Sequence, residues 1–480
     1  MHKNALQPFT KLIAFLPLFF VSVNYAHDGS VDNTNSPKAL NVQEVKQLNS
    51  LKQTALSSTL SYDLVESLTT QVGPRMMGTP GDKLSVEWAV NKMNALGFDK
   101  VWTEEVSGPQ WVRGEAQARI VAPYPHNVVA LALGGSVGTS DKGITADVAH
   151  FKTLADLQAA KKGSLKGKIA FVSYRMDRHI DGNGYGKAVG TRVTGANIAA
   201  EKGAVALIMR SVGTDNNRTA HTGVMRYKEG GTKIPAAALS NPDADLLVNQ
   251  LNRGKPVSFY LKMTSRMNNK ATVKSANVIG EITGSELPKE IVAIGAHLDS
   301  WDVGTGAIDD GMGVGMVMAA AHHISLLDKR PKRTIRVILF AAEEVGLLGA
   351  KQYMVDHKDE MKHHVLGAEW DFGLGRIYEM KTGVGAQGLN AVRELAQHLA
   401  PLGVSLAPMN NARAQSDMSL LSDAGMPSIN FSPDGSRYFD YHHTENDTLD
   451  KVNAEDLKQN TAVYTMFAFF AAQAAVDFRD

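Results

Sequence analysis

The sequence predicts an α/β fold in which a mostly parallel or mixed sheet is covered on both faces by helices. In the C-terminal half, apolar strand-like runs at 291–296 and 334–340 alternate with helical segments at 313–327 and 347–356. Parallel strands need crossover helices, so this alternation is typical of a sheet with two covered faces. A second pattern of short β-rich runs fills 116–263, which indicates an inserted β-rich unit.

The N-terminus has the layout of a secretory signal. Two lysines precede an apolar run at 12–23, and a small residue, Ala26, follows the run. The run is shorter than the roughly 20 residues that span a bilayer. We therefore predict a cleaved signal peptide over 1–26 and a mobile stretch over 27–41. The mature protein is expected to be secreted or periplasmic, with no stable membrane span.

The rest of the chain divides where its pattern changes. A chain of 480 residues exceeds what one hydrophobic core usually serves, so two or three units, or one domain with a large insertion, are expected. Helical segments begin near 42 and lead into the β-rich region, which begins near 116 and ends near 263. We predict one domain built from 42–115 and 264–480, and an insert over 116–263.

Composition excludes some classes of function and of site. The formal charge of +1 and the 21% of charged residues lack the basic surplus of a nucleic-acid-binding protein. The chain has no cysteine, which excludes disulfides and thiolate metal ligands. Any transition-metal site must therefore use His, Asp and Glu.

Two motifs with acids or a histidine follow the first predicted strand. His297 directly follows the run at 291–296 and Asp299 comes two residues later, so His297 could bind a metal while Asp299 orients it. Asp309 and Asp310 lie in a glycine-bracketed loop before a helix, which suits a carboxylate presented to a metal. Taken singly, a hydrogen-bonded structural histidine and a helix N-cap explain these residues equally well.

Further acids and histidines follow the later strands. Glu343 and Glu344 follow the run at 334–340, and if both were buried they would repel each other without a shared cation. An exposed acidic turn is the alternative. Asp371 follows another short segment. Paired histidines lie near the end of the chain, with an acid available to orient one of them, and these residues are His442, His443 and Asp447.

These motifs together resemble the co-catalytic zinc exopeptidases of the M28 type, and within that family the carboxypeptidase Q group. The resemblance covers nearly the whole mature chain. Its motifs are Gly295-Ala-His-Leu-Asp-Ser300, Gly306-Ala-Ile-Asp-Asp-Gly311, Phe340-Ala-Ala-Glu-Glu-Val-Gly346, Asp371, Gln415-Ser-Asp417, Ala424-Gly-Met-Pro427, His443 with Asp447-Thr448, and the N-terminal stretches 72–80 and 111–114. The insert resembles a protease-associated domain through 165–172, 195–204 and 234–240. Such inserts cover or shape the cleft.

The resemblance implies a zinc exopeptidase fold and a role for each motif residue. Two zinc ions per chain are implied, bridged by Asp309. Glu343 is implied as the base that takes a proton from the zinc-bound water. The implied metal ligands are His297, Asp309, Glu344, Asp371 and His443, and the implied orienting or oxyanion residues are Asp299, His442 and Asp447. His443 is preferred over His442 because of its four-residue step to Asp447.

The implied function is a secreted or periplasmic exopeptidase that hydrolyses dipeptides or short peptides. Which peptide end is read stays open, with Arg413 and Arg437 as candidate cations for a carboxylate. Two alternatives stay open, a single-zinc glutaminyl cyclase-like acyltransferase and a non-catalytic binding ectodomain on the same scaffold. A homodimer also stays open. The histidine pairs at 322–323 and 363–364 are interpreted as surface residues.

Overall fold

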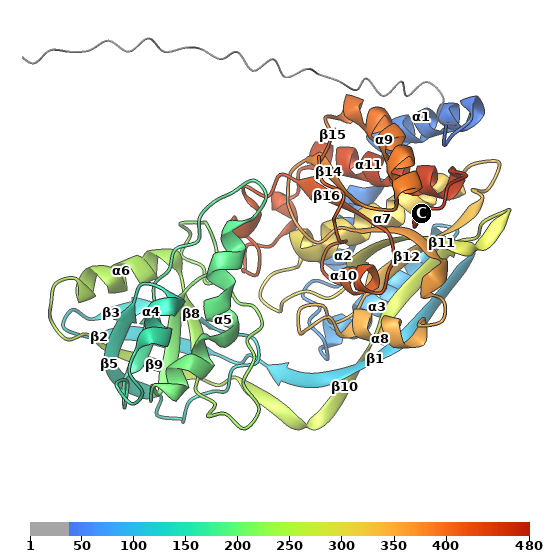
Figure 1. Ribbon diagram of the computed structural model, residues 1–480. Coiled ribbons are helices and arrows are strands. Elements are labelled where there is room, and N and C mark those ends of the chain that lie inside the picture. The colour runs from blue at the N-terminus through green and yellow to red at the C-terminus, as the bar shows by residue number, and fades with distance from the viewer. Residues whose placement is uncertain (1–37) are drawn as a thin grey trace, which may run out of the picture. The chain divides into compact units, whose positions relative to one another are not determined.

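The computed structural model describes residues 38–480, which form one compact unit. The predicted signal peptide over 1–26 and most of the stretch over 27–41 lie outside the described residues. Two eight-stranded mixed sheets are the framework of this unit (Figure 1). None of the helices within 38–480 has the length and apolar character needed to cross a bilayer.

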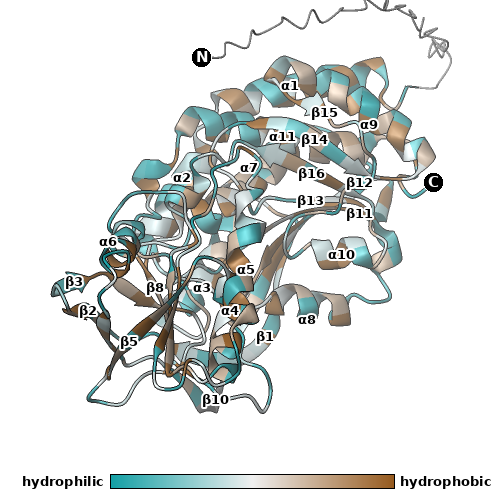
Figure 2. Ribbon diagram, turned by 60° about the vertical axis from the view of Figure 1, so that its left-hand side comes forward, coloured by the Kyte–Doolittle hydropathy of each residue, from teal (hydrophilic) through white to brown (hydrophobic). Residues whose placement is uncertain are grey.

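The first sheet has a parallel centre between antiparallel neighbours. The order across the sheet is β1 (Lys100–Val112), β10 (Arg266–Ile282), β12 (Arg333–Phe340), β11 (Leu287–His297), β13 (His364–Glu369), β16 (Ser428–Pro433), β14 (Ile377–Gly383) and β15 (Ser405–Leu406). Strands β12, β11, β13 and β16 run parallel to one another, whereas β10 pairs antiparallel with β12 and β14 pairs antiparallel with β16. The central strands are apolar along much of their length (Figure 2), as expected when both faces are covered.

Helices cover both faces of this sheet, which confirms the predicted fold class. The helices of this part are α1 (Val42–Ser57), α2 (Leu60–Gln71), α3 (Pro80–Ala95), α7 (Met312–Ser325), α8 (Leu348–Asp356), α9 (Ala386–Leu399), α10 (Ser419–Asp423) and α11 (Ala454–Gln473). On one face of the sheet, alternate residues such as Val292 and Ile294 join a core with α7 and α11. On the other face, Ile291 and Ala293 pack with α8 and α10. Short helical turns are η2 (Ala307–Gly311), η3 (Met361–His363), η4 (Ala400–Leu402), η5 (Tyr438–Asp440) and η6 (Leu449–Lys451).

The second sheet lies entirely within the segment for which an insert was predicted. Its order is β3 (His126–Val128), β2 (Ala116–Ala122), β9 (Ser258–Met263), β5 (Ile144–Phe151), β6 (Ile169–Val172), β7 (Ala206–Arg210), β8 (Ala236–Leu239) and β4 (Ala130–Ala132). Helices α4 (Leu154–Ala159), α5 (Gly184–Glu201) and α6 (Asn241–Leu251) accompany it. The division into domains and the protease-associated character of this segment stay predictions.

The interpretation of His323 and His364 as surface residues is wrong. His323 lies on α7, which packs against α2 and α11, and only 5% of its surface is exposed. His364 begins a central strand and is fully buried, with its Nε2 2.8 Å from the hydroxyl of Tyr353. Burial lowers the pKa of His364 to about 3 and that of His323 to about 4.

Candidate active site

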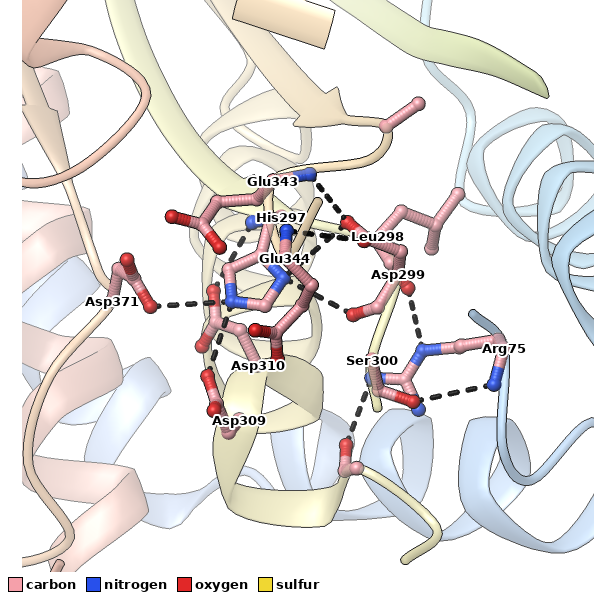
Figure 3. A network of polar contacts seen from close by, with 12 residues as sticks. Arg75, His297, Leu298, Asp299, Ser300, Asp309, Asp310, Glu343, Glu344 and Asp371 are labelled. Atoms are coloured by element: carbon pink, nitrogen blue, oxygen red, sulfur yellow. Dashed lines mark hydrogen bonds and ion pairs between the residues drawn. The ribbon is translucent and has the colours of Figure 1, made fainter. Parts of the chain in front are cut away.

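Three parallel strands end at one edge of the first sheet and deliver their following residues to one place. His297 pairs in register with Phe340 of β12, and Gly295 pairs with Glu369 of β13. Ligand sites in parallel sheets form at the carboxyl ends of strands. Consequently the end of β11, the turn after β12 and Asp371 after β13 meet at this edge (Figure 3).

His297 stands between two carboxylates. Its Nε2 lies 3.1 Å from Asp309 Oδ1 and 3.2 Å from Asp371 Oδ1. Its Nδ1 lies 3.1 Å from the carbonyl oxygen of Asp299, while the Asp299 carboxylate is 3.6 Å away. Burial alone would lower the pKa of His297, but the charge of Asp371 and hydrogen bonds to the surrounding acids raise it well above the usual value.

The second oxygen of Asp309 faces the C-terminal histidines. His443 Nε2 lies 3.2 Å from Asp309 Oδ2 and 3.1 Å from Glu344 Oε2. His442 Nε2 is farther from Asp309 Oδ2, at 3.6 Å, and its ring stacks on that of His443 with centroids 3.5 Å apart. Asp309 therefore lies at the centre of a cluster with His297 and Asp371 on one side and Glu344 and His443 on the other.

The second-sheet segment holds His443 in place. Thr222 donates its N–H to the His443 carbonyl at 3.0 Å, and the Thr222 carbonyl lies 3.3 Å from His443 Nδ1. A carbonyl oxygen only accepts, so this contact favours the tautomer with hydrogen on Nδ1. The lone pair on Nε2 then points toward Asp309 and Glu344. The Trp301 ring meets His443 edge to face, with centroids 5.7 Å apart.

Hydrogen bonds fix the turn that carries the two adjacent glutamates. The Asp299 carboxylate accepts the backbone N–H groups of Glu343 at 2.9 Å and Glu344 at 3.3 Å. Ser416 donates its hydroxyl to Glu343 Oε1 at 2.6 Å, and Gln415 Oε1 accepts the N–H of Asp371 at 2.7 Å. Sequence reasoning missed these roles of Gln415 and Ser416, although their motif contributed to the family resemblance.

Asp447 contacts a different partner from the one expected. Its Oδ1 accepts the N–H of Ile308 at 2.7 Å, so it fixes the loop that presents Asp309. Within the described residues, neither C-terminal histidine hydrogen-bonds to Asp447, and the Thr222 carbonyl takes that place beside His443. Burial raises the pKa of Asp447 to about 7.

Arg75 ties the loops beneath the cluster together. It is completely buried, and its guanidinium donates to the carbonyl oxygen of Leu298 at 2.5 Å (Figure 3). The guanidinium also donates to the carbonyl oxygens of Thr305 at 2.7 Å and Gly306 at 2.8 Å. Burial lowers the pKa of Arg75, although the surrounding acids oppose this effect. Arg75 thus ties the start of the 298–306 loop to its end, and the end of this loop is followed by Asp309.

The donor set of the cluster fits divalent metal ions. Burial, followed by the charge of Asp371, raises the pKa of Glu343 to about 8, and burial with Asp309 raises that of Glu344 well above its usual range. In the described part of the chain, Asp309 Oδ2 and Glu344 Oε1 are buried without a hydrogen bond. Crowded carboxylates with imidazoles and no thiolates suit zinc, which would relieve the repulsion. Two triads have ligand atoms close enough to share an ion: Asp309 with His297 and Asp371, and Asp309 with His442 and His443.

A cavity of about 430 Å³ opens onto this cluster. The acids Asp309, Glu343, Glu344 and Asp371 line one part of it. Arg192 and Arg226 of the second-sheet segment line another part, and no sequence motif had indicated either residue.

The arginines proposed from the sequence lie elsewhere. Arg413 pairs with Asp423 on the surface, and Arg437 donates to the hydroxyl of Tyr441. Neither Arg413 nor Arg437 lines the cavity. Arg413 and Arg437 are therefore near the C-terminal motifs in sequence but do not line the cavity beside the cluster.

Comparison with known proteins gives consistent matches. The model of peptidase family M28 matches residues 277–468. Carboxypeptidase Q of Mus musculus is 33% identical over 417 residues, which cover 86% of this chain and 85% of the relative. An M28 peptidase precursor from Shewanella amazonensis is 50% identical, with a TM-score of 0.88, and covers 91% of this chain and 98% of its own.

A more distant solved structure supports the same fold. A zinc aminopeptidase from Bacillus subtilis is 22% identical with a TM-score of 0.61, covering 88% of this chain and 97% of its own. At that identity the likeness shows the fold alone. Together with the Shewanella structure, it confirms the predicted α/β fold.

Proposed function

The chain belongs to peptidase family M28, and on that premise we propose that it is a dizinc exopeptidase that hydrolyses dipeptides or short peptides. The observation that supports this most is the cluster around Asp309, because its two carboxylate oxygens face two separate sets of ligands. A bridging carboxylate in a two-metal site has this arrangement.

Each metal would be held by residues from different strands. His297 and Asp371 would complete one site and Glu344 and His443 the other, with Asp309 shared between them. When bound, zinc supplies Lewis-acid polarisation of the scissile carbonyl and lowers the pKa of a water molecule. The structurally similar protein from Bacillus subtilis is a zinc aminopeptidase, which supports zinc as the metal.

Glu343 would move the proton. Its Oε1 is occupied by the hydroxyl of Ser416 at 2.6 Å, and Oε2 accepts no hydrogen bond within residues 38–480. Oε2 is therefore the oxygen that would take a proton from the attacking water and return it to the leaving amine. The hydrogen bonds from Glu343 and Glu344 to Asp299 keep this turn fixed while the proton moves.

His442 is a donor for the developing oxyanion in this proposal. Its ring stacks on His443 and lines the cavity beside the acids. Burial, and to a smaller extent the charge of His443, lowers the pKa of His442 well below its usual value. A neutral imidazole can still donate through one ring N–H.

We also propose export and a two-part organisation. The signal at 1–26 would direct the protein out of the cytoplasm, and 116–263 would be a protease-associated insert in a catalytic domain made of 42–115 and 264–480. N-terminal sequencing of the secreted protein tests the first proposal: a mature chain that still begins at Met1 contradicts it.

Metal analysis of the purified protein, combined with a dipeptide hydrolysis assay, tests the function. The expected result is about two zinc ions per chain by the ligand count above, with hydrolysis lost on chelation and restored by zinc. One zinc per chain with cyclisation of N-terminal glutamine would point to the acyltransferase reaction. Absence of bound metal in an inactive, folded protein would favour a binding ectodomain.

A further inference from the structure

Arg192 is a buried cation that forms no ion pair within the described residues. Only 5% of its surface is exposed, and it lines the cavity above the acidic cluster. Its NH2 donates to the hydroxyl of Tyr185 at 2.6 Å, its NH1 lies 3.4 Å from His443 Nδ1, and its Nε has no partner among residues 38–480. A buried guanidinium with an unsatisfied N–H and no ion pair is costly, so an anionic group that enters the cavity would stabilise this arrangement.

Arg226 places a second cation on the same wall. Its backbone N–H donates to the carbonyl of Val193 at 3.1 Å, so its main chain lies beside the residue that follows Arg192. A Cβ built on Gly346 would lie 2.9 Å from Arg226 NH2. Its guanidinium therefore lies against the turn that carries Glu343, and it forms no ion pair within the described chain.

The position of Gly346 relates Arg226 to the reacting groups. Gly346 donates its N–H to the Glu343 carbonyl at 2.7 Å, so both residues belong to one tight turn. Each peptide residue adds roughly 3.5 Å to an extended chain. Because Arg226 and Glu343 line the same cavity, an anionic group one or two residues beyond a carbonyl held at the metal site could meet this cation.

We propose that Arg226, assisted by Arg192, binds the C-terminal carboxylate of the substrate. Guanidinium groups bind carboxylates through two parallel hydrogen bonds, whereas a substrate amine would meet like charges on this wall. The substrate class is then the dipeptide, or a short peptide cleaved next to its C-terminal residue. This inference rests on the proposed function and adds the peptide end that the site reads.

The experiment compares three substrates with four forms of the zinc-loaded protein. The substrates are Ala-Leu, Ala-Leu amide and N-acetyl-Ala-Leu. The forms are the wild type, Arg226→Met, Arg226→Lys and the control Arg253→Met, which removes an exposed arginine that does not line the cavity. We expect the wild type to hydrolyse Ala-Leu at least about tenfold more efficiently than the amide, as one charge-assisted contact allows.

The variants distinguish carboxylate binding from a packing role. Arg226→Met is expected to raise KM for Ala-Leu about tenfold and leave the amide unchanged, with partial recovery in Arg226→Lys. Arg253→Met should match the wild type. Equal losses on both substrates in Arg226→Met, or no loss at all, would overturn the inference while the hydrolytic function stands. A zinc-loaded wild type that hydrolyses none of the three substrates would instead refute the proposed function.

Discussion

Glu343→Gln separates proton transfer from metal binding. The substitution keeps the size of the side chain, and the new amide oxygen can still accept the hydroxyl of Ser416. Glu344, not Glu343, contacts His443 Nε2 at 3.1 Å, so we expect the variant to fold and retain its zinc. Loss of a general base lowers kcat by about 10²- to 10⁴-fold, or about 3–5 kcal/mol in the activation free energy. KM should change little, because the role proposed for Glu343 is proton transfer and not substrate binding.

The assay measures kcat and zinc content on the same preparation, with Glu344→Gln as the matched variant. The neighbouring substitution removes a proposed ligand, so it should lower the zinc content as well as the activity. The reasoning is refuted if Glu343→Gln keeps kcat within tenfold of the wild type. It is refuted equally if Glu343→Gln loses zinc while Glu344→Gln retains it, because the two glutamates would then have exchanged roles.

Three further predictions concern metal, pH and positioning. Chelation should lower the thermal unfolding temperature, since the buried acids then repel one another, and zinc should restore it; an unchanged temperature contradicts a resident metal. Burial alone would lower the pKa of His357, but hydrogen bonds to Glu104 and Glu360 raise it to about 9. The resulting stability is complete below the unfolded-state pKa and disappears as the pH rises through about 9, so urea unfolding should show up to about 3 kcal/mol lost between pH 6 and 10, but not in His357→Asn. Ser416→Ala should lower kcat about tenfold without zinc loss, because Glu343 loses its hydrogen bond; unaltered kcat would remove Ser416 from the mechanism.

The central sheet could be predicted because its strands are continuous apolar runs. The run at 291–296 lies within β11, and the run at 334–340 corresponds to β12, which begins one residue earlier. The first run is followed at once by His297, and the second is followed by Glu343 after two alanines. The placement of His297 and Glu344 in one cluster follows from parallel pairing of those strands. Local sequence patterns therefore predict both the central strands and many of the residues of the site.

Long antiparallel strands and contacts distant in sequence could not be predicted in this way. The pair β1 and β10 alternates polar and apolar residues unevenly, so neither strand has the continuous apolar run that marks a buried strand. Arg192 and His443 are 251 positions apart and meet only because α5 packs beside the C-terminal loop. No local pattern marks an arginine that lines a cavity, which explains why Arg226 was missed and Arg413 was considered instead.

The second-sheet segment does more than cover the cleft, because its residues hold the loop that carries His442 and His443. His443 has a φ of 61°, a left-handed conformation that costs a residue other than glycine about 1 kcal/mol or more. Two backbone-directed contacts from Thr222 hold it there, and His221 lies between Asp215 Oδ1 at 2.7 Å and the His442 carbonyl at 2.8 Å. All three of these residues come from 211–222, outside the first sheet. Because the strained loop carries a proposed metal ligand, the segment that restrains it also determines where one metal would bind.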